Sequence, residues 1–221
     1  MNQLNFRFLM LVALPLAAQP PSSPWASPTT FEPQSLEQKF MAFSVATYGP
    51  RALFDPVLGA AIRLAKPRDT YPSEWQHGIG AFGRNYGDGL ARKSALETAR
   101  FATSALLRED FRYRPSKAKN PMVRTAYAIG FTFVDRSDSG KSQLAVSNFA
   151  GAAASGFVGS LYMPRGFDDV SHAGTRTAFA FGEFALQNLL REFAPEIGKV
   201  AKKLHVPMTP VPIPEWWVKR K

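Results

Sequence analysis

The chain has 221 residues, and its 27 Lys and Arg against 17 Asp and Glu give a formal net charge of +10. It contains no cysteine, which excludes disulfides, thiolate metal sites and cysteine nucleophiles. Hydrophobic residues make up 45% of the chain, which is typical of a globular protein with its own apolar core. The basic charge favours an anionic partner, and the alternative is that it serves solubility alone.

Residues 1–18 have the layout of a secretory signal peptide. Arg7 gives a basic start, an apolar run follows from Phe8 to Leu16, and Ala17 and Ala18 form a small-residue exit. The run is shorter than the roughly 20 residues that span a bilayer. We therefore expect export to the periplasm or outer envelope, or secretion, and no nucleic-acid partner.

Proline-rich segments are expected at both ends of the mature chain, as a linker over residues 19–34 and a tail over 207–221. The tail combines an aromatic pair with three cations, a pattern typical of residues that bind at an anionic membrane surface. The alternative is a frayed tail, or one whose Trp side chains fold back onto the domain. The membrane-surface candidates are Trp216, Trp217, Lys219, Arg220 and Lys221.

Between these ends, residues 35–206 are predicted to form one helical domain. Ser35 with Gln38 forms a capping box, and the helix that it opens should stop at Gly49. Asp55-Pro56 predicts the start of a second helix. Another capping box at Ser73 predicts a long helix that reaches about Arg108.

The second half of the domain continues this pattern. Asn120-Pro121 predicts a helix to about Val134, and a polar turn should cover Asp135–Lys141. A helix from about Ser142 to Met163 and a long helix from about Asp168 follow, and Pro195 begins or kinks a short last helix. The sequence thus predicts an all-α fold of five to seven helices. The alternative for Tyr127–Val134 is a β-hairpin that turns at Ser139-Gly140.

Small residues recur every fourth position in the two longest apolar helices. Such a face has almost no side chain, so a neighbouring helix can approach its backbone closely. Close packing would offset the cost of glycine, roughly 1 kcal/mol per helical position relative to alanine. The predicted packing residues are Gly83, Gly87, Ala91, Ala95, Ala99, Gly151, Ser155 and Gly159.

Residues 142–164 carry no charge and are long enough to cross a membrane, which leaves a small-residue helix assembly in the membrane as an alternative. Polar side chains such as Gln143 and Asn148 argue against that insertion.

Two strings imitate nucleotide-binding motifs. Gly78–Gly83 matches GxGxxG but follows a capped helix start rather than a strand, and Gly140-Lys141-Ser142 lacks the first glycine of a P-loop. The three histidines have no metal-binding spacing. We expect no cofactor and no metal, and the sequence assigns no catalytic residue.

A strip that begins at Arg108 alternates cations and aromatic residues. Arginine forks suit phosphate or carboxylate groups, so the strip is a candidate site for an anion or a partner. The alternative is an ion-paired helix exit, in which Glu109 and Asp110 satisfy the arginines. The candidates are Arg108, Arg112, Tyr113, Arg114, Lys117 and Lys119.

Three stretches of the domain, Glu74–Gly78 with Phe82–Arg84, Arg108–Tyr113, and Asn188–Phe193 with Pro195, resemble a group of exported, helical bacterial cell-envelope proteins of unknown function. The resemblance implies an envelope setting and transfers no catalytic residue.

Together these features predict a non-enzymatic envelope protein, a helical interaction or structural module whose partner is a membrane surface, an anionic envelope component or a second copy of itself. One alternative is an envelope hydrolase that acts on a lipid or a cell-wall polymer.

Overall fold

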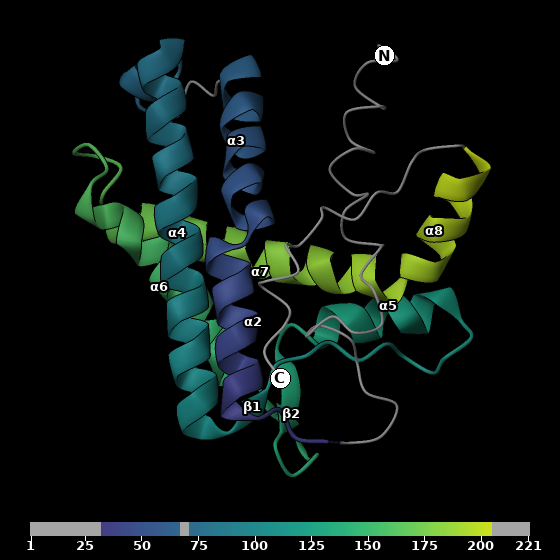
Figure 1. The fold of residues 1–221 in the computed structure, drawn as a ribbon. Helices are drawn as coiled ribbons and strands as arrows, with labels where there is room; N and C mark the ends of the chain where they lie inside the picture. Colours follow the sequence, from purple (N-terminus) through teal and green to yellow (C-terminus); the bar gives the residue numbers. More distant parts are fainter. Residues whose placement is uncertain (1–31, 67–70, 205–221) are drawn as a thin grey trace. The chain divides into compact units, whose positions relative to one another are not determined.

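Seven α-helices account for most of the residues that this computed structural model describes, 32–66 and 71–204 (Figure 1). The helices are α2 (Leu36–Tyr48), α3 (Pro50–Ala65), α4 (Gly78–Leu107), α5 (Pro121–Gly130), α6 (Val146–Val158), α7 (Val170–Glu192) and α8 (Ala194–Lys203). The predicted all-helical fold class is confirmed, with one small three-stranded sheet added. The predicted signal peptide and tail, and all but the last three residues of the predicted linker, lie outside the described residues.

The residues predicted to form one helical domain divide into two compact units. Among the described residues, unit 1 contains 32–33, 110–145 and 183–204, and unit 2 contains 34–66, 71–109 and 146–182. Helix α7 begins in unit 2 and ends in unit 1.

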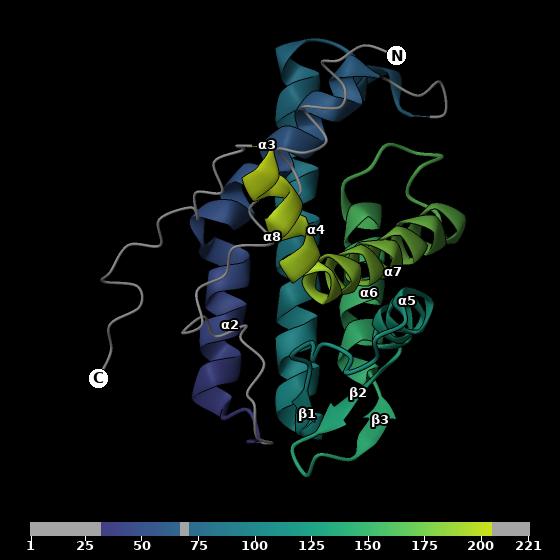
Figure 2. The ribbon, with the colours of Figure 1, turned by 90° about the vertical axis from the view of Figure 1, so that its right-hand side faces the viewer.

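Helix α4 is the centre of unit 2, and α2, α3 and α6 pack along it (Figures 1 and 2). Lys39 of α2 is buried and donates from Nζ to the carbonyl of Ser104 at 3.1 Å, so a cation satisfies the last turn of α4. The buried carboxylate of Glu109 accepts from the N–H of Ser147 at 2.9 Å, in the first turn of α6. Both contacts place a charge at the helix end where the backbone dipole favours it.

Glycines of α6 lie at the closest helix contacts of unit 2. A Cβ added to Gly151 would lie 2.9 Å from the carbonyl oxygen of Leu96 in α4. A Cβ added to Gly156 would lie 2.5 Å from the carbonyl oxygen of Ala173 in α7. Just beyond α6, a Cβ on Gly159 would lie 2.9 Å from the guanidinium of Arg176. Gly151 and Gly156 are required because a neighbouring backbone occupies the space of a side chain, and at Gly159 the part-buried side chain of Arg176 occupies that space.

The prediction of close packing is wrong for Gly83 and Gly87. Both lie within α4, and a Cβ added to either would meet no atom within 4 Å. The close approach in α4 occurs instead at Gly89, where a Cβ would lie 2.8 Å from Pro56 of α3. The fourfold spacing identified the small residues but could not show which face of α4 meets a neighbour.

Unit 1 has a core of aromatic side chains beside its hairpin. Tyr113, Ala128 and Phe131 are buried together, with Tyr127 and Leu189 packed against them. The sheet order is β1-β2-β3, with β1 at Glu109–Asp110, β2 at Val134–Ser137 and β3 at Ser142–Leu144.

Local capping signals predicted three helix starts correctly. Ser35 Oγ accepts from the N–H of Gln38 at 3.2 Å, and Gln38 Oε1 accepts from the N–H of Ser35 at 3.1 Å. Asn120 caps α5, which begins at Pro121, and Pro195 lies in the first turn of α8.

Three other predicted starts are wrong. Helix α3 begins at Pro50, and Pro56 lies inside it, packed against the bare backbone of Gly89. Ser73 begins only a 3₁₀ turn, η1 (Ser73–Trp75), so α4 starts later at Gly78. The third is the helix predicted from Ser142, where the chain forms β3 and α6 starts only at Val146.

The β-hairpin alternative is right about the turn and wrong about the strand. Gly140, with φ of 82°, lies in the turn between β2 and β3, and Asp135 pairs with Gln143 across the hairpin. Tyr127 belongs to α5, which ends at Gly130 rather than continuing to Val134.

Residues 142–164 do not form one helix, since a strand, α6 and the 3₁₀ turn η2 (Gly159–Leu161) share them. None of the helices in residues 32–66 and 71–204 has both the length and the apolarity to cross a membrane.

Candidate functional site

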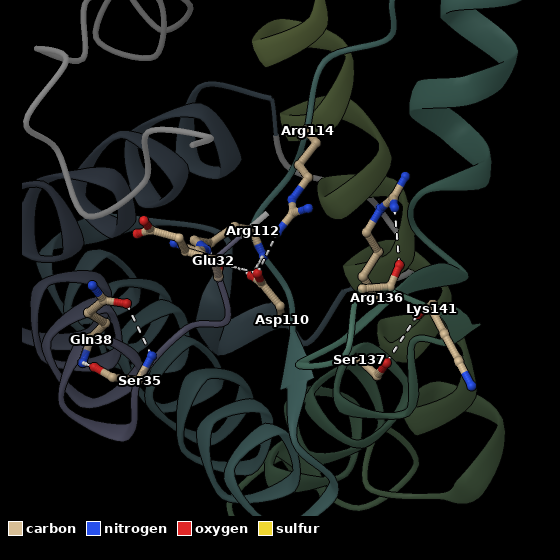
Figure 3. A network of polar contacts seen from close by, with 10 residues as sticks. Glu32, Ser35, Gln38, Asp110, Arg112, Arg114, Arg136, Ser137 and Lys141 are labelled. Atoms are coloured by element: carbon tan, nitrogen blue, oxygen red, sulfur yellow. Dashed lines mark hydrogen bonds and ion pairs between the residues drawn. The ribbon is translucent and has the colours of Figure 1, made fainter. Parts of the chain in front are cut away.

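Two of the arginines that were predicted to bind an anion, Arg112 and Arg114, form ion pairs with Asp110 (Figure 3). Arg112 donates from Nε at 2.8 Å and from its terminal nitrogen at 2.7 Å, and Arg114 adds a contact at 2.8 Å. Arg112 also donates to the carbonyl of Glu32 at 2.7 Å. Burial raises the pKa of Asp110, but the hydrogen bonds and charge of Arg112, together with the charge of Arg114, outweigh it and hold that pKa below its ordinary value. These contacts agree with one half of the ion-paired alternative: Asp110 satisfies Arg112 and Arg114, whereas Glu109 accepts from the N–H of Ser147.

Tyr113, another candidate, is buried and donates from its hydroxyl to Glu192 at 2.5 Å. Glu192 also accepts from Arg124 Nε at 2.7 Å and from the N–H of Ser116 at 2.8 Å. Burial, followed by the Glu192 carboxylate, raises the pKa of Tyr113, so its hydroxyl stays protonated. Tyr113 therefore helps to hold the core of unit 1 together and presents no surface to a ligand.

The remaining candidates of the strip are exposed. Arg108 ends α4 in the left-handed conformation, with φ of 53°. Lys117 and Lys119 precede α5, where Met122 and Val123 are also exposed, Met122 by 76%. We call these four residues before and within α5 (Lys117, Lys119, Met122 and Val123) the α5 cluster.

A second cluster of this kind, which the sequence analysis missed, lies on α8. Its members are all exposed: Lys199, Val200, Lys202, Lys203 and Leu204. The inward face of the same helix carries the buried Ala201. Three lysines among apolar residues over one and a half turns were a readable signal of a basic amphipathic helix. We call these five exposed residues the α8 cluster.

Arg124 of α5 connects the helices that carry the two clusters, both of which belong to unit 1. It bonds Glu192 at the end of α7 and Glu196 in the first turn of α8, and its guanidinium lies 4.5 Å from the centre of the Phe193 ring. Hydrogen bonds with Arg124 lower the pKa of Glu196. Arg124 therefore engages both Glu192 and Glu196.

Unit 2 contains a pocket of about 460 Å³. Residues of η1, of α4 and of the chain after η2 line it: Glu74, Trp75, Arg84, Gly87, Asp88, Ala91, Tyr162 and Pro164. Two of the predicted small residues, Gly87 and Ala91, thus face this pocket rather than another helix.

Asp88 is the buried centre of the pocket wall, with its side chain 1% exposed. One carboxylate oxygen lies 2.9 Å from Arg63 and 3.9 Å from Arg92, and the other accepts from the Tyr162 hydroxyl at 2.8 Å. Burial and then the Asp88 charge raise the pKa of Tyr162. The Tyr162 hydroxyl is thus held as a hydrogen-bond donor to Asp88, and Arg63 balances the charge of that carboxylate. Neither group is available as a free base. Sequence reasoning missed it because its members are up to 99 positions apart; the only local signal is Asp88 between two glycines.

The pocket brings together two acidic residues, Glu74 and Asp88, but none of the described histidines. Its lining includes neither His77 nor His172, and neither Glu183 nor the Arg108–Arg114 strip. His172 instead pairs with Asp169 at 2.8 Å, and Asp169 also caps the first turn of α7. Among the described residues, no group of three or more His, Asp and Glu side chains is arranged to hold a metal ion.

Comparisons with protein-family models, with curated proteins and with solved structures found no match.

Proposed function

We propose that this chain is an exported, non-enzymatic envelope protein that associates with an anionic partner, in the first place the surface of an anionic membrane. The supporting observation is how the charges divide between interior and surface. Among the described residues six carboxylates are buried (Asp88, Glu97, Glu109, Asp110, Asp135 and Glu192), against three buried cations (Lys39, Arg100 and Arg112). The described surface is therefore more basic than the composition indicates.

The α5 and α8 clusters are the part of that surface best suited to a bilayer. Five lysines stand beside four exposed apolar side chains. Lysine near an anionic surface contributes about 1 kcal/mol, and apolar side chains beside it can enter the headgroup layer. Because Arg124 engages Glu192 and Glu196, these carboxylates do not oppose the lysines.

Export rests on the signal-peptide pattern of residues 1–18, and the envelope setting also on the resemblance of the domain. The predicted tail cations would add to the same surface attraction. The described pocket lining contains no serine, threonine or histidine, which supports a binding role over the hydrolase alternative.

Sedimentation with vesicles tests the proposal. The full mature chain should bind vesicles of phosphatidylglycerol and phosphatidylcholine and not vesicles of phosphatidylcholine alone. Lys199→Glu, Lys202→Glu and Lys203→Glu together should reduce the partition coefficient by about 100-fold or more at low salt.

The control variant keeps the same change in net charge elsewhere. Arg108→Glu, Lys141→Glu and Arg165→Glu replace three exposed cations outside both clusters. Equal loss of binding in both variants would reduce the effect to net charge. Equal binding to neutral and anionic vesicles would remove the proposal.

A further inference from the structure

We propose that the unit 2 pocket binds a small organic anion, a carboxylate or phosphate carried on an aromatic or otherwise flat apolar group. This ligand site is separate from the surface clusters of unit 1. The volume of about 460 Å³ is in the range of pockets that hold small molecules.

Bare backbone provides the space for the ligand. Glycine inside a helix costs about 1 kcal/mol relative to alanine. At Gly89, Gly151 and Gly156 a neighbouring helix explains it, whereas Gly59, Gly83 and Gly174 meet open space as Gly87 does. At Gly87 no protein atom lies within 4 Å of a Cβ position, and Gly87 faces the pocket. The room that Gly87 leaves is pocket volume, not helix contact.

The walls fit a flat, apolar body. Trp75 is almost fully buried, and Tyr162 and Pro164 come from the segment after η2. The bond from Tyr162 to Asp88 at 2.8 Å fixes the phenol, and Ala91 adds a small apolar surface. Rigid aromatic walls with few polar groups are typical of sites for small molecules.

Arginine supplies the anion-binding charge. Arg84 lines the pocket and donates to the carbonyl of Glu74 at 2.7 Å, which orients its guanidinium and leaves its charge without an ion pair among the described residues. Arg92 is not part of the lining but lies 3.9 Å from the lining residue Asp88, whose charge Arg63 already balances, and the buried Nε of Arg92 has no described hydrogen-bond partner. An anion would compensate this excess, and a guanidinium fork suits both carboxylate and phosphate.

The Glu74 carboxylate also lines the pocket and opposes an anion there. The charge of Glu74 therefore provides a test of whether the ligand is an anion. Removing its charge should strengthen the binding of an anion and weaken the binding of a cationic or zwitterionic ligand.

The probes are phenyl phosphate, benzoate and phenol, titrated into the full mature chain and followed by the indole N–H signal of Trp75 in NMR spectra. Trp75→Phe identifies that signal. Phenyl phosphate or benzoate should shift it saturably, and the stronger of the two identifies the acid group. Phenol should bind at least about tenfold more weakly. Equal binding of phenol, or no saturable shift with either anion, would overturn the proposal.

Two glycine variants separate the pocket from helix stability. Gly87→Leu fills the pocket and should abolish binding. Gly83→Leu is matched to it, one turn earlier in α4, with the same open space at Cβ but outside the pocket lining, and should bind as the wild type does. Thermal unfolding establishes that both variants fold. Unchanged binding by Gly87→Leu would contradict the inference.

Two charge variants test the same site independently of its shape. Arg84→Ala, at an exposed position, should weaken anion binding by about tenfold or more, and Glu74→Gln should strengthen it. Unchanged anion binding in Arg84→Ala, or weaker anion binding in Glu74→Gln, would overturn the assignment of an anionic ligand.

Discussion

Replacing single glycines with alanine should stabilise unit 2 at one position and destabilise it at another, although both glycines lie inside helices. At Gly156 of α6, a Cβ would lie 2.0 Å from Thr177 Oγ1, 2.5 Å from the carbonyl oxygen of Ala173 and 2.9 Å from the N–H nitrogen of Thr177. Two of these atoms belong to the backbone of α7 and cannot rotate away. Helices α6 and α7 must therefore separate by about 1 Å to reach ordinary contact.

The magnitude follows from two opposing effects. Overpacking a well-filled contact costs about 1–3 kcal/mol, and displacing Thr177 Oγ1 also endangers its 2.9 Å bond to the Ala173 carbonyl. Alanine returns about 1 kcal/mol of helix propensity. Gly156→Ala should therefore lower the free energy of unfolding by about 2 kcal/mol. At Gly83, where a Cβ meets nothing, alanine should raise it by about 1 kcal/mol.

The assay is urea unfolding followed by far-ultraviolet circular dichroism, with the free energy compared at unchanged slope. Gly156→Ala with Thr177→Ala should recover only part of the loss, because the Ala173 carbonyl remains. A stabilised Gly156→Ala, or a destabilised Gly83→Ala, would refute the assignment of close packing to α6 and of open space to this face of α4.

The buried carboxylates give three further predictions. Asp110→Asn should cost about 3–5 kcal/mol near pH 7, because it leaves buried arginines without their counter-charge. Because folding lowers the pKa of Asp110, the stability that its charge contributes is complete above the unfolded carboxyl pKa of about 4 and is lost as the pH falls through the lower folded value. In urea unfolding, the difference in stability between wild type and Asp110→Asn should therefore be smaller at pH 3 than at pH 7. An equal difference at the two pH values would contradict this reasoning. Glu192→Ala should destabilise unit 1 by a similar 3–5 kcal/mol, because Arg124 loses the partner at 2.7 Å, and an unchanged melting temperature would refute this. Glu109→Ala should cost about 1–2 kcal/mol by uncapping the N–H of Ser147, with faster amide hydrogen exchange at the start of α6 as the readout; unchanged exchange there would count against the cap.

Helices whose starts are marked by capping residues or a first-turn proline could be predicted from the sequence. The capping box of Ser35 and the Asn120-Pro121 pair act within one turn of the chain, so their geometry follows from neighbouring residues. The helical fold class, which depends on many such signals, was predicted for the same reason.

Features that depend on distant partners could not be predicted. Asp55-Pro56 is typical of a helix start, yet Pro56 lies inside α3 and packs against the bare backbone of Gly89, which is distant in the sequence. Gly83 and Gly87 share the spacing of packing glycines, and only the placement of neighbouring helices shows that they face open space. In both cases the outcome depends on contacts between residues far apart in the sequence, which a local sequence pattern does not show.

The candidate site divides in the same way. The arginines of the strip could be identified from the sequence, but whether Arg112 and Arg114 bind an outside anion depended on Asp110, which is their partner in the structure. The α8 cluster could have been recognised from its lysine spacing. The pocket around Asp88 could not, since Arg63 and Tyr162 reach it from separate segments.

Hydrogen–deuterium exchange of the full mature chain, with and without anionic vesicles, tests the central claim most directly. We expect slower exchange over residues 117–123 and 194–204, where exposed lysines and apolar side chains lie together, and no change in α4. Unchanged exchange in both segments while the protein is bound to the vesicles, or slowing confined to unit 2, would contradict the claim that these clusters contact the membrane.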